Sequence, residues 1–339
     1  MQLAVLLAVG SGLSSLVLTA AVRNYAVRHD VLDLPNERSS HHAPTPRGGG
    51  LAVLIGIAAA LVIGGAAGAI NSVDAITLGV GIVVLGLVGW MDDHGGLRAR
   101  IRLVTHIAVA AWTLVMFRGF PAMRIGESSL SFGIVGWVLA IIGIVWSINL
   151  FNFMDGIDGL AGSQAVLIFA AAAWLLFVAN DRSLGTIAMV ISAACAGFLV
   201  HNWPPAKIFM GDVGSGAIGY LIAALAVASE NHHSVPVIVY AIFGGVFIAD
   251  ATVTLVRRIA RGDRPADAHR DHAYQRLSRA WASHERVTVA AAAVTSILCV
   301  VGAIATRSPA LLLPSLLAAY SILGLLLVAA ERRAPLRRA

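Results

Sequence analysis

The chain has 339 residues, of which 58% are hydrophobic and 12% are charged, and its formal net charge is +6. A soluble domain carries about twice that charged fraction, so the composition excludes one large soluble core and indicates a polytopic membrane protein. In such a protein an excess of positive charge marks cytoplasmic loops, and we expect no nucleic-acid partner. Cys195 and Cys299 lie inside apolar runs without a partner motif, which argues against a disulfide framework or a zinc site.

Eleven apolar runs are long enough to cross a bilayer, which takes about 20 helical residues. They lie at residues 3–22, 49–70, 74–91, 102–119, 132–150, 159–179, 184–201, 214–229, 234–256, 287–305 and 310–330. The first run has no basic residue before it, so we expect a retained helix and not a secretory signal. We predict an all-α, polytopic membrane fold of about 11 transmembrane helices, with residues 1–339 forming a single transmembrane domain.

The distribution of basic residues predicts the orientation. With the N-terminus outside, one side of the membrane receives the C-terminal tail and the loops at residues 23–48, 92–102, 151–158, 202–213 and 257–286. That side carries 20 of the 24 Lys and Arg residues, and the other side carries Arg118, Arg124, Arg182 and Arg307. The positive-inside rule therefore makes the first side, and the C-terminus, cytoplasmic.

The first cytoplasmic loop reads DLPNERSSHHAPTPRGGG from Asp33 to Gly50. Its proline and glycine content predicts an irregular segment. Arg38, His41 and Arg47 could meet an anion, and consecutive glycines let backbone approach a ligand closely. The alternative is a solvated loop with basic anchors.

Asp92 and Asp93 end a long apolar run in the sequence GWMDDHGGL. Adjacent carboxylates repel each other, and burial adds to that cost. A divalent cation or a proton would relieve the repulsion. The alternative is an ordinary polar turn.

The stretch from Asn149 to Gly162 reads NLFNFMDGIDGLAG and joins two apolar runs. Its carboxylates, Asp155 and Asp158, and its amides, including Asn152, would lose hydration beside the hydrocarbon. A chain that keeps such a cluster is expected to use it. The alternative is a polar turn in which Asp158 caps the next helix.

The segment HNWPPAKIFMGDVGSG, from His201 to Gly216, places Asp212 at a helix start. Exposed N–H groups there favour a phosphate, and the carboxylate favours a metal ion. Alone this is a weak capping signal, and Asn202 and Phe209 make it more specific.

The loop at residues 257–286 is the longest and most basic. His269 and His272 could contact a phosphate or a sugar, with a solvated pair as the alternative. One face of the helix expected after them is apolar and surrounded by arginines, which is typical of a helix lying on the membrane surface. That face carries Tyr274, Leu277 and Trp281.

Five carboxylates are thus expected at one membrane face, close to several helix N-termini: Asp92, Asp93, Asp155, Asp158 and Asp212. This collection suits Mg²⁺ with a phosphorylated substrate, because Mg²⁺ prefers carboxylates together with phosphate oxygens and waters. Asp250, inside the ninth run, is expected to be either a structural partner or a group that supports a site residue from behind.

In order and spacing these motifs resemble glycosyltransferase family 4, the polyprenyl-phosphate N-acetylhexosamine-1-phosphate transferases that include the phospho-N-acetylmuramoyl-pentapeptide transferase. The resemblance runs nearly the full length, through DLPNERSSH with PTPRGGG, MDD, NLFNFMDGIDGLAG, HNWPPAKIFMGDVGSG and HRDH. It is nearest to the branch that starts O-antigen or similar surface glycans.

The resemblance implies that a polyprenyl phosphate, inferred to be undecaprenyl phosphate, attacks the β-phosphorus of a UDP-N-acetylhexosamine in the bacterial inner membrane and releases UMP. It implies Mg²⁺, with Mn²⁺ as an alternative, and allows a homodimer. One-step transfer and a covalent aspartyl intermediate both fit. The roles it implies are catalytic for Asp92 and Asp93, metal-binding for Asp212 and Asp155, nucleotide-binding for Asn152, Asp155, Asp158, Asn202 and Phe209, and sugar- or diphosphate-binding for His269, His272, Arg38 and His41.

Two departures from the family pattern and two other classes of protein bear on this interpretation. The first loop lacks the adjacent basic pair of many relatives, and Asp271 interrupts the histidine cluster, which argues against the peptidoglycan translocase. The alternative from another class is a cation- or proton-coupled transporter, because intramembrane carboxylates are typical of it. Acids at helix ends would favour the enzyme. CDP-alcohol phosphotransferases share only the Asp-Gly-Ile-Asp-Gly pattern.

Overall fold

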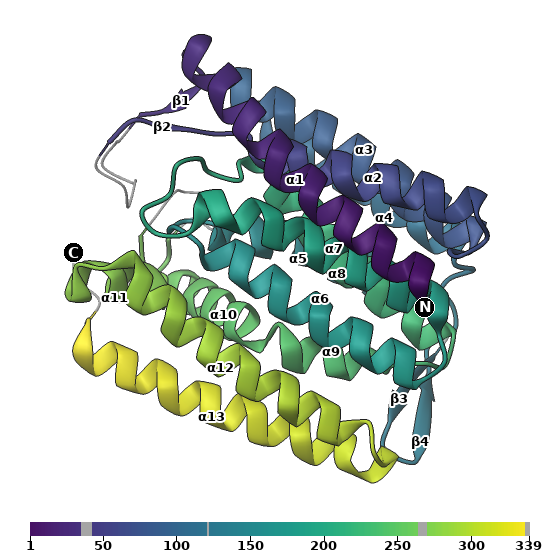
Figure 1. Cartoon of the computed structure of the whole chain (residues 1–339). Coiled ribbons are helices and arrows are strands. Elements are labelled where there is room, and N and C mark those ends of the chain that lie inside the picture. The colour runs from purple at the N-terminus through teal and green to yellow at the C-terminus, as the bar shows by residue number, and fades with distance from the viewer. Residues whose placement is uncertain (35–42, 121, 264–269, 336–339) are drawn as a thin grey trace.

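The structure, a computed structural model, describes residues 1–34, 43–120, 122–263 and 270–335 and consists mainly of helices (Figure 1). The helices are α1 (Gln2–Arg28), α2 (Gly50–Ala66), α3 (Ser72–Gly95), α4 (Ala99–Met116), α5 (Ile134–Met154), α6 (Leu160–Val178), α7 (Arg182–Asn202), α8 (Asp212–Asn231), α9 (Val237–Phe243), α10 (Gly245–Ala260), α11 (Ala273–Trp281), α12 (His284–Ala305), the 3₁₀ turn η1 (Pro309–Leu311) and α13 (Leu312–Arg333). Two antiparallel ribbons pair β1 (Leu32–Asp33) with β2 (Thr45–Pro46) and β3 (Ala122–Ile125) with β4 (Ser128–Ser131).

Each of the apolar runs coincides with helical structure. Among the described residues, 9 helices are long and apolar enough to cross a membrane, α9 and α10 together would make a tenth span, and α2 is an apolar helix of 17 residues. Helices suit the bilayer because they satisfy every backbone hydrogen bond within the segment. The prediction of an all-α polytopic membrane protein is therefore confirmed.

The ninth run, predicted as one span over residues 234–256, is broken in two. The chain turns by 78° between α9 and α10, at the glycine pair Gly244-Gly245. Glycine pairs permit a sharp kink, and Gly245 packs closely here, since a Cβ on it would lie 2.8 Å from Leu323 Cδ1 of α13. The break sends α10 along a direction different from that of α9.

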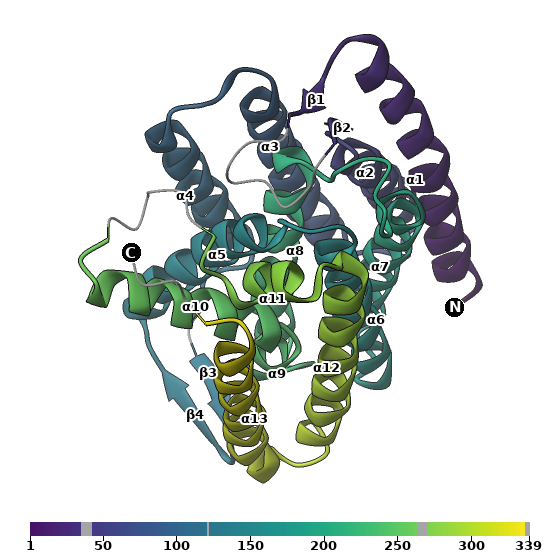
Figure 2. The same ribbon diagram turned by 90° about the vertical axis from the view of Figure 1, so that its left-hand side faces the viewer.

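Helix α8, which corresponds to the shortest predicted run, is the most enclosed of the spans. It packs against α3 and α5 and lies in the middle of the bundle (Figure 2). Small residues permit this approach, as is common between membrane helices. A Cβ on Gly50 would lie 2.3 Å from Gly214 Cα, and one on Gly219 would lie 2.4 Å from the carbonyl oxygen of Ser147. The glycines of this run therefore allow its central position.

The β3–β4 hairpin, which the sequence did not predict, lies at the end of the bundle opposite Asp92. The backbone N–H and Nε of Arg124 both donate to Glu230 Oε1 at 3.0 Å. Glu230 is buried, and a buried carboxylate needs such a partner. The hairpin therefore supplies a cation to the end of α8.

An ion pair at this same end should make stability depend on pH. Asp181, the N-cap of α7, accepts a hydrogen bond from Leu184 N–H, and its Oδ2 lies 2.9 Å from His232 Nδ1. Burial alone would raise the pKa of Asp181, but the hydrogen bonds from His232 and Leu184 hold it below its ordinary value. The hydrogen bond to Asp181 raises the pKa of His232.

The direction in which stability changes with pH follows from the pKa shifts of Asp181 and His232. The contribution of Asp181 is present above its unfolded pKa and is lost as the pH falls through its lowered folded pKa, whereas that of His232 is full below its unfolded pKa and is lost as the pH rises through its raised folded pKa. Because the pair is partly exposed, we expect His232→Gln to lower the free energy of unfolding by about 0.5–1 kcal/mol near pH 5.5 and by less above about pH 8.5. Thermal unfolding in detergent across this range measures the difference, and a difference that does not change with pH would contradict the pairing.

Candidate active site

The C-terminal end of α3 and the first turn of α8 are held together by a carboxylate. Asp93, in the last turn of α3, accepts hydrogen bonds from the backbone N–H of Asp212 at 3.1 Å and of Val213 at 3.2 Å. These N–H groups begin α8 and have no partner within their own helix, so Asp93 supplies the cap. Gly89 makes the approach possible, because a Cβ there would lie 2.4 Å from the carbonyl oxygen of Asp212. A catalytic role for Asp93 stays a prediction, and its structural role is to anchor α8.

Asp92 and the guanidinium of Arg102, which belongs to α4, lie beside the start of α8. Arg102 Nη1 forms an ion pair with Asp92 Oδ2 and lies 3.7 Å from Asp212 Oδ2. From α5, Asn152 Nδ2 donates to Asp212 Oδ1 at 2.7 Å and to Ser215 Oγ at 2.9 Å. Four helices thus bring two carboxylates, an amide and a guanidinium to one point.

These side chains open into a cavity of about 560 Å³. Its polar lining consists of Asp92, Arg102, His106, Asn149, Asn152, Asp212, His272 and Gln275. Four of these were singled out from the sequence for a site role, and Asn149 was noted with the Asn152 cluster, whereas the functional roles of Arg102, His106 and Gln275 were missed. Arg102 and His106 are four residues apart in an apolar helix, a spacing that places two costly polar groups on one helical face and could have identified them.

His272 is held on the cavity wall by Asp250. Asp250 accepts the N–H of Ala273 at 2.8 Å and of Tyr274 at 3.1 Å, and its Oδ1 lies 3.4 Å from His272 Nδ1. Asp250 therefore serves as a structural partner, as expected, by capping α11. Tyr274 is buried and its hydroxyl donates to the carbonyl oxygen of Phe153 at 3.0 Å. The prediction that Tyr274 faces the membrane surface is wrong, because this contact docks α11 into the protein.

A second cavity of about 720 Å³ lies on the other side of the α5–α6 connection. It is lined by Asp158, Phe209, Arg270, Arg279 and His284, among others. The two cavities share their walls. The last turn of α5 contributes Phe153 to the first and the connection that follows it contributes Asp158 to the second, and α11 contributes Gln275 to the first and Ser278 to the second. They are therefore neighbours, separated by these two segments.

Asp158 and Asn202 hold the segment that carries Phe209. Asp158 Oδ2 accepts the N–H of Ala206 at 3.0 Å. Asn202 is buried, its Oδ1 accepts the N–H of Gly159 at 3.0 Å, and its Nδ2 donates to the carbonyl oxygen of Ile208 at 3.0 Å. The predicted nucleotide residues thus separate into Asn152 in the first cavity, Asp158 and Phe209 in the second, and Asn202 beneath the connecting segment. Direct contact of Asn202 with a nucleotide stays a prediction.

Asp155 lies between these groups, directly after α5. Burial, followed by the negative charges of Asp212, Asp93 and Asp158, raises the pKa of Asp155 to about 7. The described residues contain no group of three or more His, Cys, Asp or Glu side chains arranged to hold a metal ion. Its predicted role as a metal ligand therefore stays a prediction.

Asp92 and Asp212 nevertheless fit a magnesium ion. Mg²⁺ in phosphate chemistry uses one or two carboxylates and takes its other ligands from phosphate and water. The guanidinium of Arg102 contacts both carboxylates, so a cation between them is already favourable.

Three residues predicted to contact the sugar or the diphosphate, Arg38, His41 and His269, lie outside the described residues.

The acids of the first cavity lie at helix ends. Asp92 is in the last turn of α3 and Asp212 is the first residue of α8. Carboxylates and a guanidinium around a cavity at one end of a helical bundle are the arrangement expected of a membrane protein that handles charged substrates at the membrane surface. Carriers place their sites near the bilayer midplane, which makes the transporter the weaker alternative.

Comparison with known proteins identifies the family of this chain. The model of glycosyl transferase family 4 matches residues 75–230. The chain is 32% identical over 302 residues to a decaprenyl-phosphate N-acetylglucosaminephosphotransferase of Mycolicibacterium smegmatis, covering 80% of this chain and 74% of that protein. It is 29% identical over 278 residues to a probable undecaprenyl-phosphate N-acetylglucosaminyl 1-phosphate transferase of Bacillus subtilis, covering 80% and 76%. A phospho-N-acetylmuramoyl-pentapeptide-transferase of Picosynechococcus is 31% identical over 237 residues, covering 63% and 60%. The protein belongs to glycosyl transferase family 4, and the resemblance of its motifs to this family is confirmed.

Proposed function

We propose that this protein transfers an N-acetylhexosamine 1-phosphate from a UDP-sugar to a polyprenyl phosphate in the bacterial inner membrane. The acceptor is undecaprenyl phosphate, the products are UMP and a polyprenyl-diphosphate sugar, and the reaction is the first membrane step of O-antigen or another cell-envelope glycan. The observation that carries the proposal is the meeting of Asp92, Arg102, Asn152 and Asp212 on one cavity at the ends of membrane helices. The names of the three relatives describe transfers of this kind.

The proposed reaction breaks the phosphoanhydride bond of the UDP-sugar and forms a new phosphoanhydride bond to the lipid phosphate. An oxygen of the lipid phosphate attacks the β-phosphorus of the donor, the bond from that phosphorus to the bridging oxygen breaks, and UMP leaves with that oxygen. Such transfers need mainly positioning and charge neutralisation. Arg102, which lines the cavity and is 41% exposed, donates to phosphate oxygens, and Asn152 holds Asp212 in orientation. The lipid phosphate is largely ionised at neutral pH, since its second pKa is about 6, so Asp92 acts by orienting Arg102.

Asp212, with Asp92 beside it, would hold Mg²⁺ or Mn²⁺, with Asp155 as the further predicted ligand. The ion would supply a positive charge for the diphosphate oxygens. His272, fixed on the cavity wall by Asp250, would contact the sugar or the diphosphate.

The second cavity is proposed to take the nucleotide. Phe209 offers a face for stacking of the uracil ring, and Arg270 and Arg279 offer positive charge. Because the two cavities share walls, a donor that spans them would place its uridine in one and its diphosphate in the other.

The experiment that tests the function is UMP release by the purified protein in detergent, with undecaprenyl phosphate, Mg²⁺ and a panel of UDP-sugars. The panel includes UDP-N-acetylglucosamine and rarer N-acetylated deoxy sugars. We expect UMP from at least one donor, only in the presence of lipid, and loss of the product when the metal is chelated. Folded protein that binds the lipid and releases no UMP from any donor would contradict the proposal and favour a carrier.

A further inference from the structure

The first turn of α12 holds Asp158 at two points. His284, the first residue of α12, places its Nδ1 3.2 Å from Asp158 Oδ1. Thr288, one turn further along the helix, is buried, and its hydroxyl donates to the backbone carbonyl of Asp158 at 2.8 Å. Neither His284 nor Thr288 was predicted from the sequence to take part in the site. Helix α12 thus fixes both the side chain and the backbone of a residue in the connection between α5 and α6.

The contact between His284 and Asp158 is suited to holding the carboxylate in one orientation. A carboxylate can only accept hydrogen bonds, so Nδ1 of His284 carries the proton and donates to it. The backbone N–H of Asp158 lies farther from the same nitrogen, at 3.5 Å. The side chain of His284 is 19% exposed and that of Asp158 is 13% exposed. A hydrogen bond to a carboxylate is stronger where water is largely excluded.

Asp158 transmits this constraint to the segment that ends at Phe209. Its Oδ2 accepts the N–H of Ala206 at 3.0 Å. At the other end of the segment, the N–H of Phe209 donates to the carbonyl oxygen of Pro46 at 2.8 Å, and its own carbonyl oxygen accepts the N–H of Gly49 at 2.9 Å. The first loop therefore holds the end of the segment, and Asp158 holds its middle.

These groups border the second cavity. His284, Asp158, Ala206 and Phe209 all line it. If the carboxylate of Asp158 turned away, the backbone at Ala206 would lose its acceptor and the wall that carries the Phe209 ring would shift. His284 can therefore control the shape of this cavity through Asp158.

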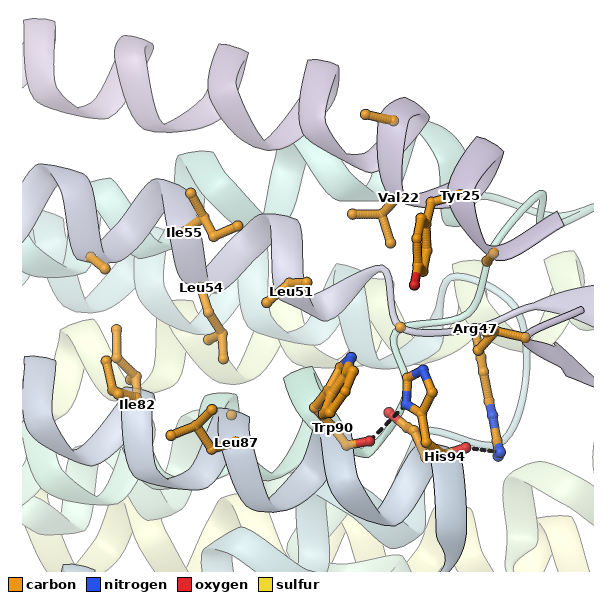
Figure 3. Close-up of a pocket in the computed structure, with 18 residues that line it drawn as sticks. Val22, Tyr25, Arg47, Leu51, Leu54, Ile55, Ile82, Leu87, Trp90 and His94 are labelled. Atoms are coloured by element: carbon orange, nitrogen blue, oxygen red, sulfur yellow. Dashed lines mark hydrogen bonds between the residues drawn. The ribbon is translucent and has the colours of Figure 1, made fainter. Parts of the chain in front are cut away.

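The influence of His284 is confined to the second cavity. His284 lines neither the first cavity nor the apolar groove of about 770 Å³ along α1, α2 and α3, whose walls include Leu54, Ile82 and Trp90 (Figure 3). The groove and the second cavity have no lining residue in common. A change at His284 should therefore leave these other two spaces as they are.

We propose that His284 is a positioning residue for the nucleotide of the donor. By holding Asp158, it keeps residues 204–209 in the shape that receives the nucleotide. The inference rests on the proposed function, which places the nucleotide in the second cavity. Its consequence is a selective one: without His284, the donor binds more weakly, while binding of the lipid and the rate at saturation are preserved.

The test is steady-state UMP release by the full-length protein in detergent, with the UDP-sugar and undecaprenyl phosphate varied in turn. We expect His284→Ala to raise the KM for the UDP-sugar about tenfold, without changing the KM for the lipid or kcat. Val289→Ala is the matched control, because Val289 is on the same helix, is 48% exposed and lines none of these three spaces. An unchanged KM for the donor, or equal rises in both KM values, would overturn the proposal.

Two further variants separate positioning from a general effect on stability. The side-chain nitrogen of asparagine falls near the place of Nδ1 of a histidine, whereas that of glutamine falls near the place of Nε2. We therefore expect His284→Asn to restore the KM for the donor and His284→Gln to keep the defect of His284→Ala. Thermal unfolding in the same detergent is measured for all of them. A KM that follows the unfolding temperature, with no difference between asparagine and glutamine, would contradict the positioning role.

Binding of UMP, measured by calorimetry, distinguishes failure of this inference from failure of the proposed function. UMP release with an unchanged donor KM in His284→Ala would overturn the role of His284 and leave the transferase. If the protein releases no UMP from any donor but binds UMP, and His284→Ala weakens this binding about tenfold, the role of His284 stands and the transferase is contradicted. No binding of UMP and no release of it would contradict both.

Discussion

Asp212→Asn is expected to lower the rate of UMP release by about 10³-fold or more. The substitution keeps the shape of the side chain but removes the negative charge that lies 3.7 Å from Arg102 and that Asn152 orients. It also removes the carboxylate that we propose as a ligand of the divalent cation. The backbone N–H of residue 212 still meets Asp93, so α8 should keep its start and the protein should remain folded.

Initial rates at saturating donor and lipid measure this effect, with thermal unfolding in the same detergent as the check on folding. Asp263→Asn is the matched control, because it removes an exposed carboxylate from the same end of the molecule without touching either cavity. A variant at position 212 that keeps more than about a tenth of the wild-type rate would show that its carboxylate is not needed for transfer.

Gly89→Ala should have the second large effect, on stability and activity together. A Cβ at this position would lie 2.4 Å from the carbonyl oxygen of Asp212 and 2.6 Å from the Cα of Val213. Both atoms belong to backbone, so relief requires that α3 and α8 move apart. We expect a loss of about 1–3 kcal/mol in the free energy of unfolding, and nearly complete loss of transfer because Asp92 and Asp212 separate.

Gly79→Ala on the same helix is the control, since its Cβ would meet only Leu61 Cδ1 at 4.0 Å. The pair is compared by thermal unfolding and by UMP release. If Gly89→Ala were as stable and as active as Gly79→Ala, the close contact of α3 with α8 would not be what assembles the site.

Much of the fold could be predicted from the sequence, because the bilayer restricts what a spanning segment can be. Each span must be apolar and about 20 residues long, so the runs stand out. The exact helix ends were harder to predict. Asp92 and Asp93 lie within α3, and Asn152 lies within α5, although they were placed in or next to loops. Polar residues can extend a helix past the hydrocarbon, and hydropathy does not register that extension.

The candidate site was predicted in part, for a different reason. Polar groups at the ends of apolar runs are conspicuous, and Asp92, Asn152, Asp212 and His272 do line one cavity. Arg102 was counted only as a basic loop residue, because nothing in its own segment shows that Asp92 and Asp212 lie opposite it. Asn202 and Asp158 were predicted to meet the nucleotide, which stays a prediction, and the sequence did not show that both also bind backbone groups of neighbouring segments.

The sequence by itself determined the class of the protein, the number of apolar runs, the predicted cytoplasmic face and the polar motifs, because the cost of removing charge from water is a property of single segments. Only the tertiary structure decided which carboxylate faces the cavity and which one caps a helix. Asp92 faces the cavity while its neighbour Asp93 caps α8, because α3 meets α8 at Gly89 and successive residues on a helix point about 100° apart. The bend between α9 and α10 likewise became visible only in the tertiary structure.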